Sequence, residues 1–318
     1  MTRRFDAPTT PSPRKPAGER PRTATFTAFG LASEAEPLAP GLHIVATPIG
    51  NLRDITIRAL ATLAAADAVL AEDTRVTRTL LAHYGITTPL LAYHEHSNDA
   101  VRERMVGRLR AGEALALVSD AGTPLVSDPG YKLVQSAIEA GIPITPVPGP
   151  SAVMTALVAA GLPTDRFFFE GFLPQKAGAR RNRLEALVQV AGTQVLFESP
   201  HRLPEMLADA AAILGADRPA AVTRELTKLY ETIRRDTLGA LSARFAEDGP
   251  PKGEIVVIIG AAPVQERTVE GDAALDALLK TAMERHSIKD AASLVADETG
   301  QPRRLVYTRA LALARSEG

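Results

Sequence analysis

The amino-acid sequence predicts an α/β protein with two α/β domains and a small helical module at its C-terminal end. Three observations support this class. From residue 41 onward, short apolar segments typical of buried strands alternate with segments of helical periodicity. Beyond residue 163, strand-like segments also follow one another directly, and beyond residue 270 no strand pattern occurs. The predicted parts are a tail, a parallel-sheet domain, a mixed-sheet domain and a helical module, over residues 1–40, 41–162, 163–262 and 270–318.

The first 40 residues differ in composition from the rest of the chain. They hold seven prolines, and basic residues outnumber acidic ones in residues 1–22. Such a segment buries too little apolar surface to offset the conformational entropy that is lost on ordering it. We therefore predict a disordered tail over residues 1–40.

In the first domain, apolar runs and helical runs alternate along the chain. Asp54 is a candidate N-cap for the first helix. Because parallel strands need a crossover connection, usually a helix, the alternation predicts a parallel sheet. The expected strands are 42–47, 68–72, 114–119 and one within 141–149, and the expected helices are 55–66, 77–85, 131–141 and 151–161.

The second domain mixes direct strand-to-strand connections with strand–helix units, which favours a mixed sheet. Three short helices are expected over residues 271–316. Within them, residues 287–314 have the spacing of a helix–turn–helix, with Gly300 and Pro302 in the turn. The expected strands of the second domain are 167–172, 193–199, 218–225, 230–237 and 254–260, with helices near 179–190 and 203–214.

The composition of the whole chain excludes several kinds of chemistry. The 318 residues carry a formal net charge of -1 and include no cysteine, so there is no disulfide, no thiolate nucleophile and no Cys-based metal site. No apolar run reaches the roughly 18 residues that span a bilayer. We expect a cytoplasmic protein that does not enter a membrane and holds no metal.

Four turns rich in Gly, Pro and Ser each follow an expected strand. The chain lacks G-x-G-x-x-G after a strand and lacks a P-loop, so dinucleotide and P-loop nucleotide sites lose their main support. One such turn alone would be a plain connector. Four of them, all poor in cationic side chains, favour a cleft that binds its ligand through backbone groups and takes no phosphate-rich anion. These turns cover residues 46–51, 119–130, 147–152 and 169–174.

The ordered series of motifs from residue 42 onward resembles the tetrapyrrole methylase family. The motifs are "TPIGNLRDIT", "VSDAGTPLVSDPGY", "PGPSA", "FESPHRL" and "RELTKLYET". The resemblance implies two α/β domains of the tetrapyrrole methylase type, S-adenosylmethionine as the cofactor, and a homodimer. It implies cofactor contacts at Pro48, Asp120, Ala121, Gly122, Thr123, Pro124, Ser127, Ser151, Ala152, Glu198, Leu226 and Gly253.

Within that family, the series is most similar to the branch that methylates the ribose 2'-hydroxyl of a cytidine in the decoding region of 16S rRNA. The resemblance therefore implies 16S rRNA, or the small ribosomal subunit, as the partner. Two alternatives stay open: a small-molecule tetrapyrrole methyltransferase of the precorrin type, and a catalytically silent RNA-binding protein. The Arg-rich helix and the added C-terminal helices count against the first, and the intact cofactor loops count against the second.

Methyl transfer to a hydroxyl calls for a base that accepts the leaving proton. The candidates at expected strand ends are Glu72, Asp73 and Glu225, with His94 or His96 as further ones. Each carboxylate has a structural alternative, an ion pair with Arg75 or Arg224. The sequence does not choose among these residues. The "HEH" of residues 94–96 lacks the additional ligands that a metal site needs.

Two cationic segments are candidates for contact with RNA. Lys176, Arg180, Arg181 and Arg183 lie at the start of an expected helix, where cations oppose the helix dipole. A phosphate ligand would explain them, although a solvated surface would as well. Near the C-terminus, Arg303 and Arg304 lie just after the expected turn of the helix–turn–helix.

Overall fold

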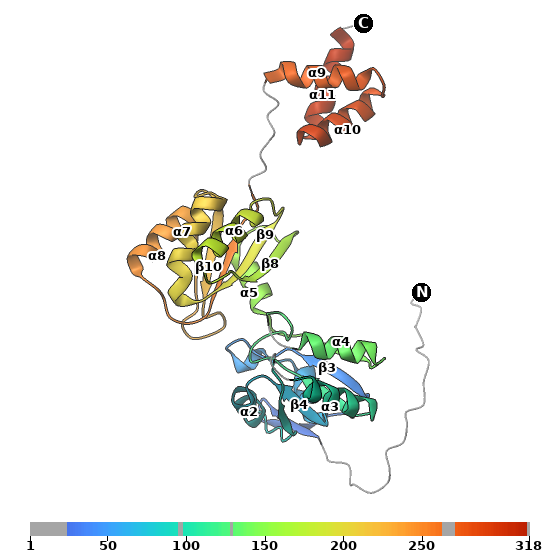
Figure 1. Ribbon diagram of the computed structural model, residues 1–318, viewed down its shortest axis with the longest axis vertical. Coiled ribbons are helices and arrows are strands. Elements are labelled where there is room, and N and C mark those ends of the chain that lie inside the picture. Colours follow the sequence, from blue (N-terminus) through green and yellow to red (C-terminus); the bar gives the residue numbers. More distant parts are fainter. Residues whose placement is uncertain (1–23, 95–97, 128–129, 263–270, 317–318) are drawn as a thin grey trace. The chain divides into compact units, whose positions relative to one another are not determined.

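The computed structural model describes residues 24–94, 98–127, 130–262 and 271–316 (Figure 1). The chain divides into two compact units, residues 1–152 and 153–318. This division falls ten residues before the boundary expected at residue 162, because helix α5 (Ala152–Ala160) groups with the second unit. Among the described residues, no helix is long and apolar enough to cross a membrane.

The first unit is built on a five-stranded, all-parallel sheet in the order β5-β4-β6-β3-β7. Its central strands are buried on both faces, which explains why they read as continuous apolar runs. The strands are β3 (Gly41–Val45), β4 (Ala68–Ala71), β5 (Leu90–Ala92), β6 (Ala114–Leu117) and β7 (Ile144–Val147).

Helices cover both faces of this sheet. Val69 packs with Leu60 of α1 and Leu81 of α2 in one core, whereas Leu70 packs with Met105 of α3 and Leu133 of α4 in the other. The parallel α/β architecture is therefore confirmed, and β5 and α3 are additions that the sequence reading had not identified. The helices are α1 (Ile57–Ala65), α2 (Thr74–His83), α3 (Asp99–Arg110) and α4 (Tyr131–Glu139), with the 3-10 helix η1 (Leu52–Asp54) before α1.

The prediction of a disordered tail is wrong for residues 24–40. Strands β1 (Thr25–Ala28) and β2 (Leu31–Glu34) form an antiparallel hairpin whose turn residues, Phe29 and Gly30, both have positive φ. Phe26 is buried in the core beside α1, and the Thr27 N–H donates to the Tyr84 carbonyl at 2.8 Å. The prediction used the average composition of residues 1–40, which does not reveal a short strand with alternating exposed and buried residues such as β1. The rest of the predicted tail, residues 1–23, lies outside the described residues.

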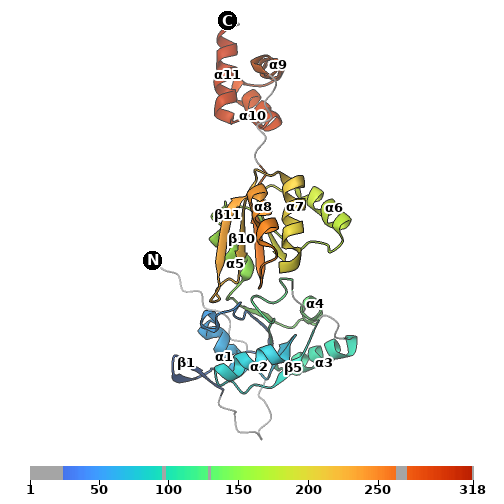
Figure 2. The ribbon, with the colours of Figure 1, turned by 90° about the vertical axis from the view of Figure 1, so that its left-hand side faces the viewer.

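The second unit holds a mixed five-stranded sheet in the order β11-β10-β12-β9-β8, as expected. Only the β8–β9 pair is parallel among these strands. Figure 2 shows α6, α7 and α8 together on one side of this sheet, where they share one apolar core with it. The elements are β8 (Phe167–Phe172), α6 (Ala177–Leu187), β9 (Thr193–Glu198), η2 (Pro200–Arg202), α7 (Leu203–Leu214), β10 (Pro219–Arg224), β11 (Thr232–Thr237), α8 (Leu238–Asp248) and β12 (Ile255–Ile259).

The C-terminal module consists of three helices, as the sequence predicted. They are α9 (Gly271–Met283), α10 (Ile288–Thr299) and α11 (Arg303–Ser316), and they enclose a small core of their own. Ser287 caps α10, and Gly300 ends it in the left-handed conformation that glycine adopts at little cost. A turn of three residues then leads into α11, which is the connection of a helix–turn–helix.

Candidate active site

In the first unit, the loops after β3 and β6 are joined by their backbones. The Thr47 N–H donates to the Gly122 carbonyl at 2.8 Å, and the Gly122 N–H donates to the Thr47 carbonyl at 3.0 Å. The buried Thr47 hydroxyl also donates to the Ser119 carbonyl at 3.2 Å. This bridge brings Pro48 next to the predicted cofactor residues of the β6 loop. Sequence reasoning missed Thr47 and Ser119, whose only signal was a small hydroxyl residue at the end of each strand.

Two further strand-end loops join this cluster. The Thr123 hydroxyl donates to the Pro150 carbonyl at 3.0 Å, which places Ser151 and Ala152 beside the β6 loop. Asp120 accepts from the Asp73 N–H at 2.9 Å and so ties in the loop after β4. The structure therefore brings together all the cofactor candidates that lie in the first unit. They are Pro48, Asp120, Ala121, Gly122, Thr123, Pro124, Ser127, Ser151 and Ala152.

The β6 loop is held in an uncommon backbone conformation. Gly122 has φ +83°, and the non-glycine residues Leu125 and Ser127 have φ of 74° and 63°. A Cβ added at Gly122 would lie 3.2 Å from Ile49 Cγ2. Because such conformations carry strain and concentrate at ligand sites, this loop is the strongest backbone indication of a ligand in the first unit.

The chemistry of this loop fits S-adenosylmethionine. The cofactor has a cationic sulfonium, a ribose diol and an adenine edge, which backbone groups and small side chains can bind. Residues 118–127 contribute the carboxylate of Asp120 and no cationic side chain. A cation beside the sulfonium would be repulsive, whereas a carboxylate is not.

In the second unit, the other three cofactor candidates lie at one end of the sheet. Glu198, the last residue of β9, pairs with Ile255 of β12. Ile255 also pairs with Arg224, the last residue of β10, which lies two residues before Leu226. A Cβ added at Gly253 would lie 2.5 Å from the Glu225 carboxyl carbon. A side chain at position 253 would therefore displace the Glu225 carboxyl group, and the φ of +98° at this position favours glycine.

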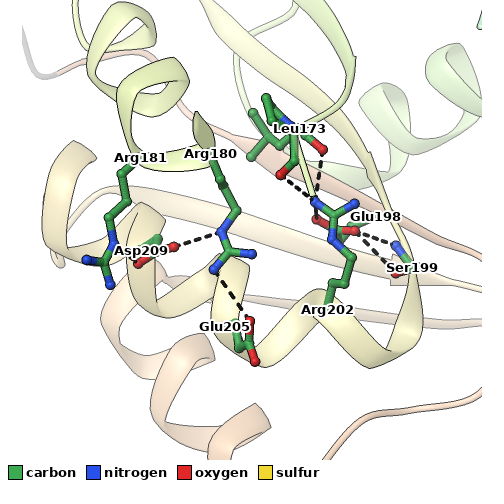
Figure 3. A network of polar contacts seen from close by, with 9 residues as sticks. Leu173, Arg180, Arg181, Glu198, Ser199, Arg202, Glu205 and Asp209 are labelled. Carbon is green, nitrogen blue, oxygen red and sulfur yellow. Dashed lines mark hydrogen bonds and ion pairs between the residues drawn. The ribbon is translucent and has the colours of Figure 1, made fainter. Parts of the chain in front are cut away.

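The Glu198 carboxylate is enclosed within a polar network (Figure 3). Its side chain is 1% exposed, accepts from the Ser199 N–H at 2.7 Å and lies 3.3 Å from the Arg202 guanidinium. Arg202 in turn donates to the Leu173 and Pro174 carbonyls at 2.9 and 3.1 Å. Burial raises the pKa of the Glu198 carboxyl, and its contacts with Ser199 and Arg202 offset that rise only in part. Through Arg202, Glu198 holds the loop after β8 against β9.

Two of the candidate bases are engaged in ion pairs that weaken them as bases. The hydrogen bonds from Arg75 lower the pKa of Asp73, the N-cap of α2, to about 2. The hydrogen bond from the Lys228 ammonium, at 2.8 Å, lowers the pKa of Glu225. The expected alternative of a structural pair thus applies to both, with Lys228 in place of Arg224. An efficient general base has a pKa near the working pH, so Asp73 and Glu225 are poor candidates.

The remaining base candidates are Glu72 and the two histidines. Glu72 is half-buried at the end of β4, next to Asp73 and therefore beside the loop cluster of the first unit. His94 is exposed, and His96 lies outside the described residues. In the part of the chain that the structure describes, no group of acidic and histidine side chains could hold a metal ion.

Arg180, which the sequence reading assigned to RNA, lies inside the second unit (Figure 3). Its side chain is 4% exposed, and its Nε donates to Asp209 of α7 at 2.7 Å. Its terminal nitrogen lies 3.5 Å from Glu205. A phosphate cannot reach this guanidinium, so the predicted RNA contact of Arg180 is wrong.

The neighbours of Arg180 remain on the surface. Arg181 donates to the second oxygen of Asp209 at 2.8 Å, and Arg183 donates to both oxygens of Glu170 at 2.6 and 2.7 Å. Their side chains are 62% and 42% exposed, and Lys176 is exposed at the N-cap of α6. These carboxylates explain Arg181 and Arg183 of α6 without a ligand. RNA contact by Lys176, Arg181 and Arg183 stays a prediction.

Comparison with known proteins identifies two family models along the chain. "Tetrapyrrole (Corrin/Porphyrin) Methylases" matches residues 41–242, and "RsmI C-terminal HTH domain" matches residues 269–314.

Solved structures share the fold at low sequence identity. A cobalt precorrin-4 methyltransferase has a TM-score of 0.53 and 22% identity, covering 69% of this chain and 94% of that one. A diphthine synthase has a TM-score of 0.54 and 18% identity, covering 69% and 89%.

Much closer relatives carry the name ribosomal RNA small subunit methyltransferase I. The protein of Mesorhizobium japonicum is 51% identical over 284 residues, which cover 89% of this chain and 96% of that protein. The protein of Escherichia coli O157:H7 is 47% identical over 272 residues, covering 85% and 94%. The chain therefore belongs to the tetrapyrrole methylases, and within them to the ribosomal RNA small subunit methyltransferase I family of S-adenosylmethionine-dependent enzymes.

Proposed function

We propose that this protein transfers a methyl group from S-adenosylmethionine to the ribose 2'-hydroxyl of a cytidine in the decoding region of 16S rRNA, in the cytoplasm. The observation that carries the proposal is the loop cluster of the first unit, in which four strand-end loops meet around Gly122 and the β6 loop itself has no cationic side chain. We take the identity of the substrate from the likeness to proteins named as small-subunit rRNA methyltransferases.

The residues of the cluster act by binding and orientation. When bound, S-adenosylmethionine supplies a methyl group on a cationic sulfonium. The Thr47–Gly122 bridge fixes the backbone that holds this cofactor, and the buried Thr47 hydroxyl keeps the bridge in place. Positioning the acceptor oxygen in line with the methyl–sulfur bond supplies much of the acceleration.

A base within hydrogen-bond reach helps the acceptor hydroxyl to lose its proton. Ion pairs with Arg75 and Lys228 lower the pKa of Asp73 and Glu225, so these two are weaker bases, and Glu72 is the carboxylate candidate that we favour. It also lies at the end of β4, one residue from the Asp73 N–H that binds Asp120. We infer that Glu72, or one of His94 and His96, accepts the proton.

The decisive test is the chemical position of the transferred methyl group. Labelled S-adenosylmethionine is incubated with the protein and small ribosomal subunits, naked 16S rRNA or a uroporphyrinogen. Alkali cleaves RNA through attack of the 2'-oxygen, so a methylated 2'-oxygen leaves a labelled, alkali-resistant dinucleotide. Label on an ordinary mononucleotide would place the methyl on the base, and label on the uroporphyrinogen alone would favour the small-molecule alternative.

We also propose that the protein is a homodimer. Strand β8 is an edge of the second sheet and exposes Phe167, Phe168 and Phe172, by 44%, 38% and 57%. An unpaired strand edge with large apolar side chains is a surface that soluble proteins normally cover. Sedimentation at micromolar concentration should give twice the chain mass of 33.7 kDa, and Phe172→Glu should shift it toward the monomer. A monomeric mass for the unmodified protein would contradict this.

A further inference from the structure

Helix α11 carries four arginines and no acidic residue over residues 303–316, but the four are not equivalent. Arg303 pairs with Asp297 of α10 at 3.0 Å, and Arg309 donates to Asp276 of α9 at 2.6 Å. Both therefore have a carboxylate within their own module. Among the residues that the structure describes, no carboxylate pairs with Arg304 or Arg315.

Arg304 and Arg315 share one face of α11 with an aromatic side chain. Residues 304, 307, 308, 311 and 315 are spaced by three and four, which places them on one stripe of a helix. Arg304, Tyr307, Thr308 and Arg315 are exposed there, and Tyr307 is 41% exposed. The buried residues Val306 and Ala310 face the module's core on the other side. We call residues 304, 307, 308, 311 and 315 the outer face of α11.

The position of α11 in the module makes this face available to a partner. It is the second helix of a helix–turn–helix, the element that such modules present to nucleic acid. Arg304 and Arg315 are eleven residues apart, or about 16 Å along the helix axis. They can therefore contact two different phosphates, with Tyr307 between them.

We propose that the outer face of α11 binds the phosphate backbone of the RNA substrate, with Arg304 and Arg315 on phosphates and Tyr307 against a ribose or an unpaired base. The inference rests on the proposed function, which makes RNA the substrate. A helix cannot read base edges in the deep, narrow major groove of A-form RNA, so the contact is to the backbone and to unpaired bases. The face therefore anchors the substrate and leaves the chemistry to the first unit.

The test measures RNA affinity of the full chain against salt concentration, with 16S rRNA and small subunits as probes. Each phosphate contact contributes roughly 0.7 to 0.9 to the slope of log affinity against log salt. We expect Arg304→Ala/Arg315→Ala to lower that slope by about 1.5 and to raise KM for the RNA substrate. The affinity for S-adenosylmethionine and the kcat should stay as in the unmodified protein.

Two matched variants sharpen the result. Arg303→Ala removes the same charge from the adjacent position. Because Arg303 is paired with Asp297, we expect this variant to change the slope by less than half as much as Arg304→Ala does. Tyr307→Ala should weaken RNA binding without changing the slope, and Tyr307→Phe should restore most of the affinity. Circular dichroism checks that the helices of each variant remain folded.

The outcomes separate this inference from the proposed function. An unchanged slope in the double variant, or equal effects of Arg303→Ala and Arg304→Ala, overturns the assignment of this face even if rRNA is methylated. A protein that methylates no rRNA refutes the proposed function, and the binding titration still decides whether this face holds RNA. In the double variant, a loss of affinity for small subunits but not for naked 16S rRNA would indicate a protein partner and would also overturn the inference.

Discussion

Replacing Gly122 with valine is expected to lower the affinity for S-adenosylmethionine by at least about 100-fold, the equivalent of two lost hydrogen bonds. A Cβ at position 122 would lie 3.2 Å from Ile49 Cγ2, so the larger valine side chain would collide with Ile49. It would also fill the space in which the backbone of residue 122 must approach the cofactor. A β-branched residue at φ +83° also strains the bridge between Thr47 and Gly122. Isothermal titration calorimetry measures the affinity directly.

Gly112 offers a matched control for backbone strain. It has φ +89°, close to that of Gly122, but nothing lies within 4 Å of an added Cβ. It precedes β6, whereas Gly122 follows the other end of the same strand. Gly112→Val should therefore lower the melting temperature by a similar amount and leave the cofactor affinity unchanged. If Gly122→Val binds the cofactor normally, or if both variants lose it equally, the placement of the site in this loop is wrong.

Replacing Asp209 with alanine is expected to destabilise the second unit by about 3 kcal/mol, because it leaves a buried cation without its partner. Asp209 accepts from the Nε atoms of Arg180 and Arg181 at 2.7 and 2.8 Å, and the Arg180 side chain is 4% exposed. The nearest other carboxylate of this network, Glu205, lies 3.5 Å away and is 74% exposed. Urea unfolding, followed by circular dichroism, measures the loss.

The effect of Asp209 should depend on pH in a defined direction. Burial opposes ionisation of this carboxyl, but the hydrogen bonds from Arg181 and Arg180 outweigh it and hold the pKa below its ordinary value of 3.8. A group with a depressed folded-state pKa stabilises the fold above its unfolded pKa, and this contribution is lost as pH falls through the folded value. The stability difference between the unmodified protein and Asp209→Ala should therefore be full at neutral pH and shrink below pH of about 4.

Asp248 supplies the control for this prediction. It pairs with Arg234 at 2.7 Å in the same unit, but its side chain is 47% exposed. An exposed pair contributes about 0 to 1 kcal/mol, so Asp248→Ala should have little effect. Equal losses from the two variants would show that burial does not set the strength of the Arg180–Asp209 pair.

The sequence by itself determined the architecture and the family. Parallel strands buried on both faces are continuous apolar runs, and each is followed by a helix, so local periodicity was enough to predict a parallel sheet. It missed β5, which is not buried, and the α3 that follows it. The strand-end loops could be predicted because Gly, Pro and Ser mark turns wherever they occur. The same loops, in their order, carried the resemblance to the tetrapyrrole methylases.

Only the tertiary structure decided which charged side chains are available. Arg180 and Arg181 are neighbours in the sequence, yet one is buried and the other exposed, because α7 brings Asp209 to them from 29 and 28 residues away. Arg303 has a carboxylate partner in Asp297, whereas no carboxylate among the described residues pairs with Arg304. Other pairs are local: the pKa values of Asp73 and Glu225 are lowered by Arg75 and Lys228, two and three residues further along the chain. Pairing between distant segments is set by the fold, and local residue patterns do not predict it.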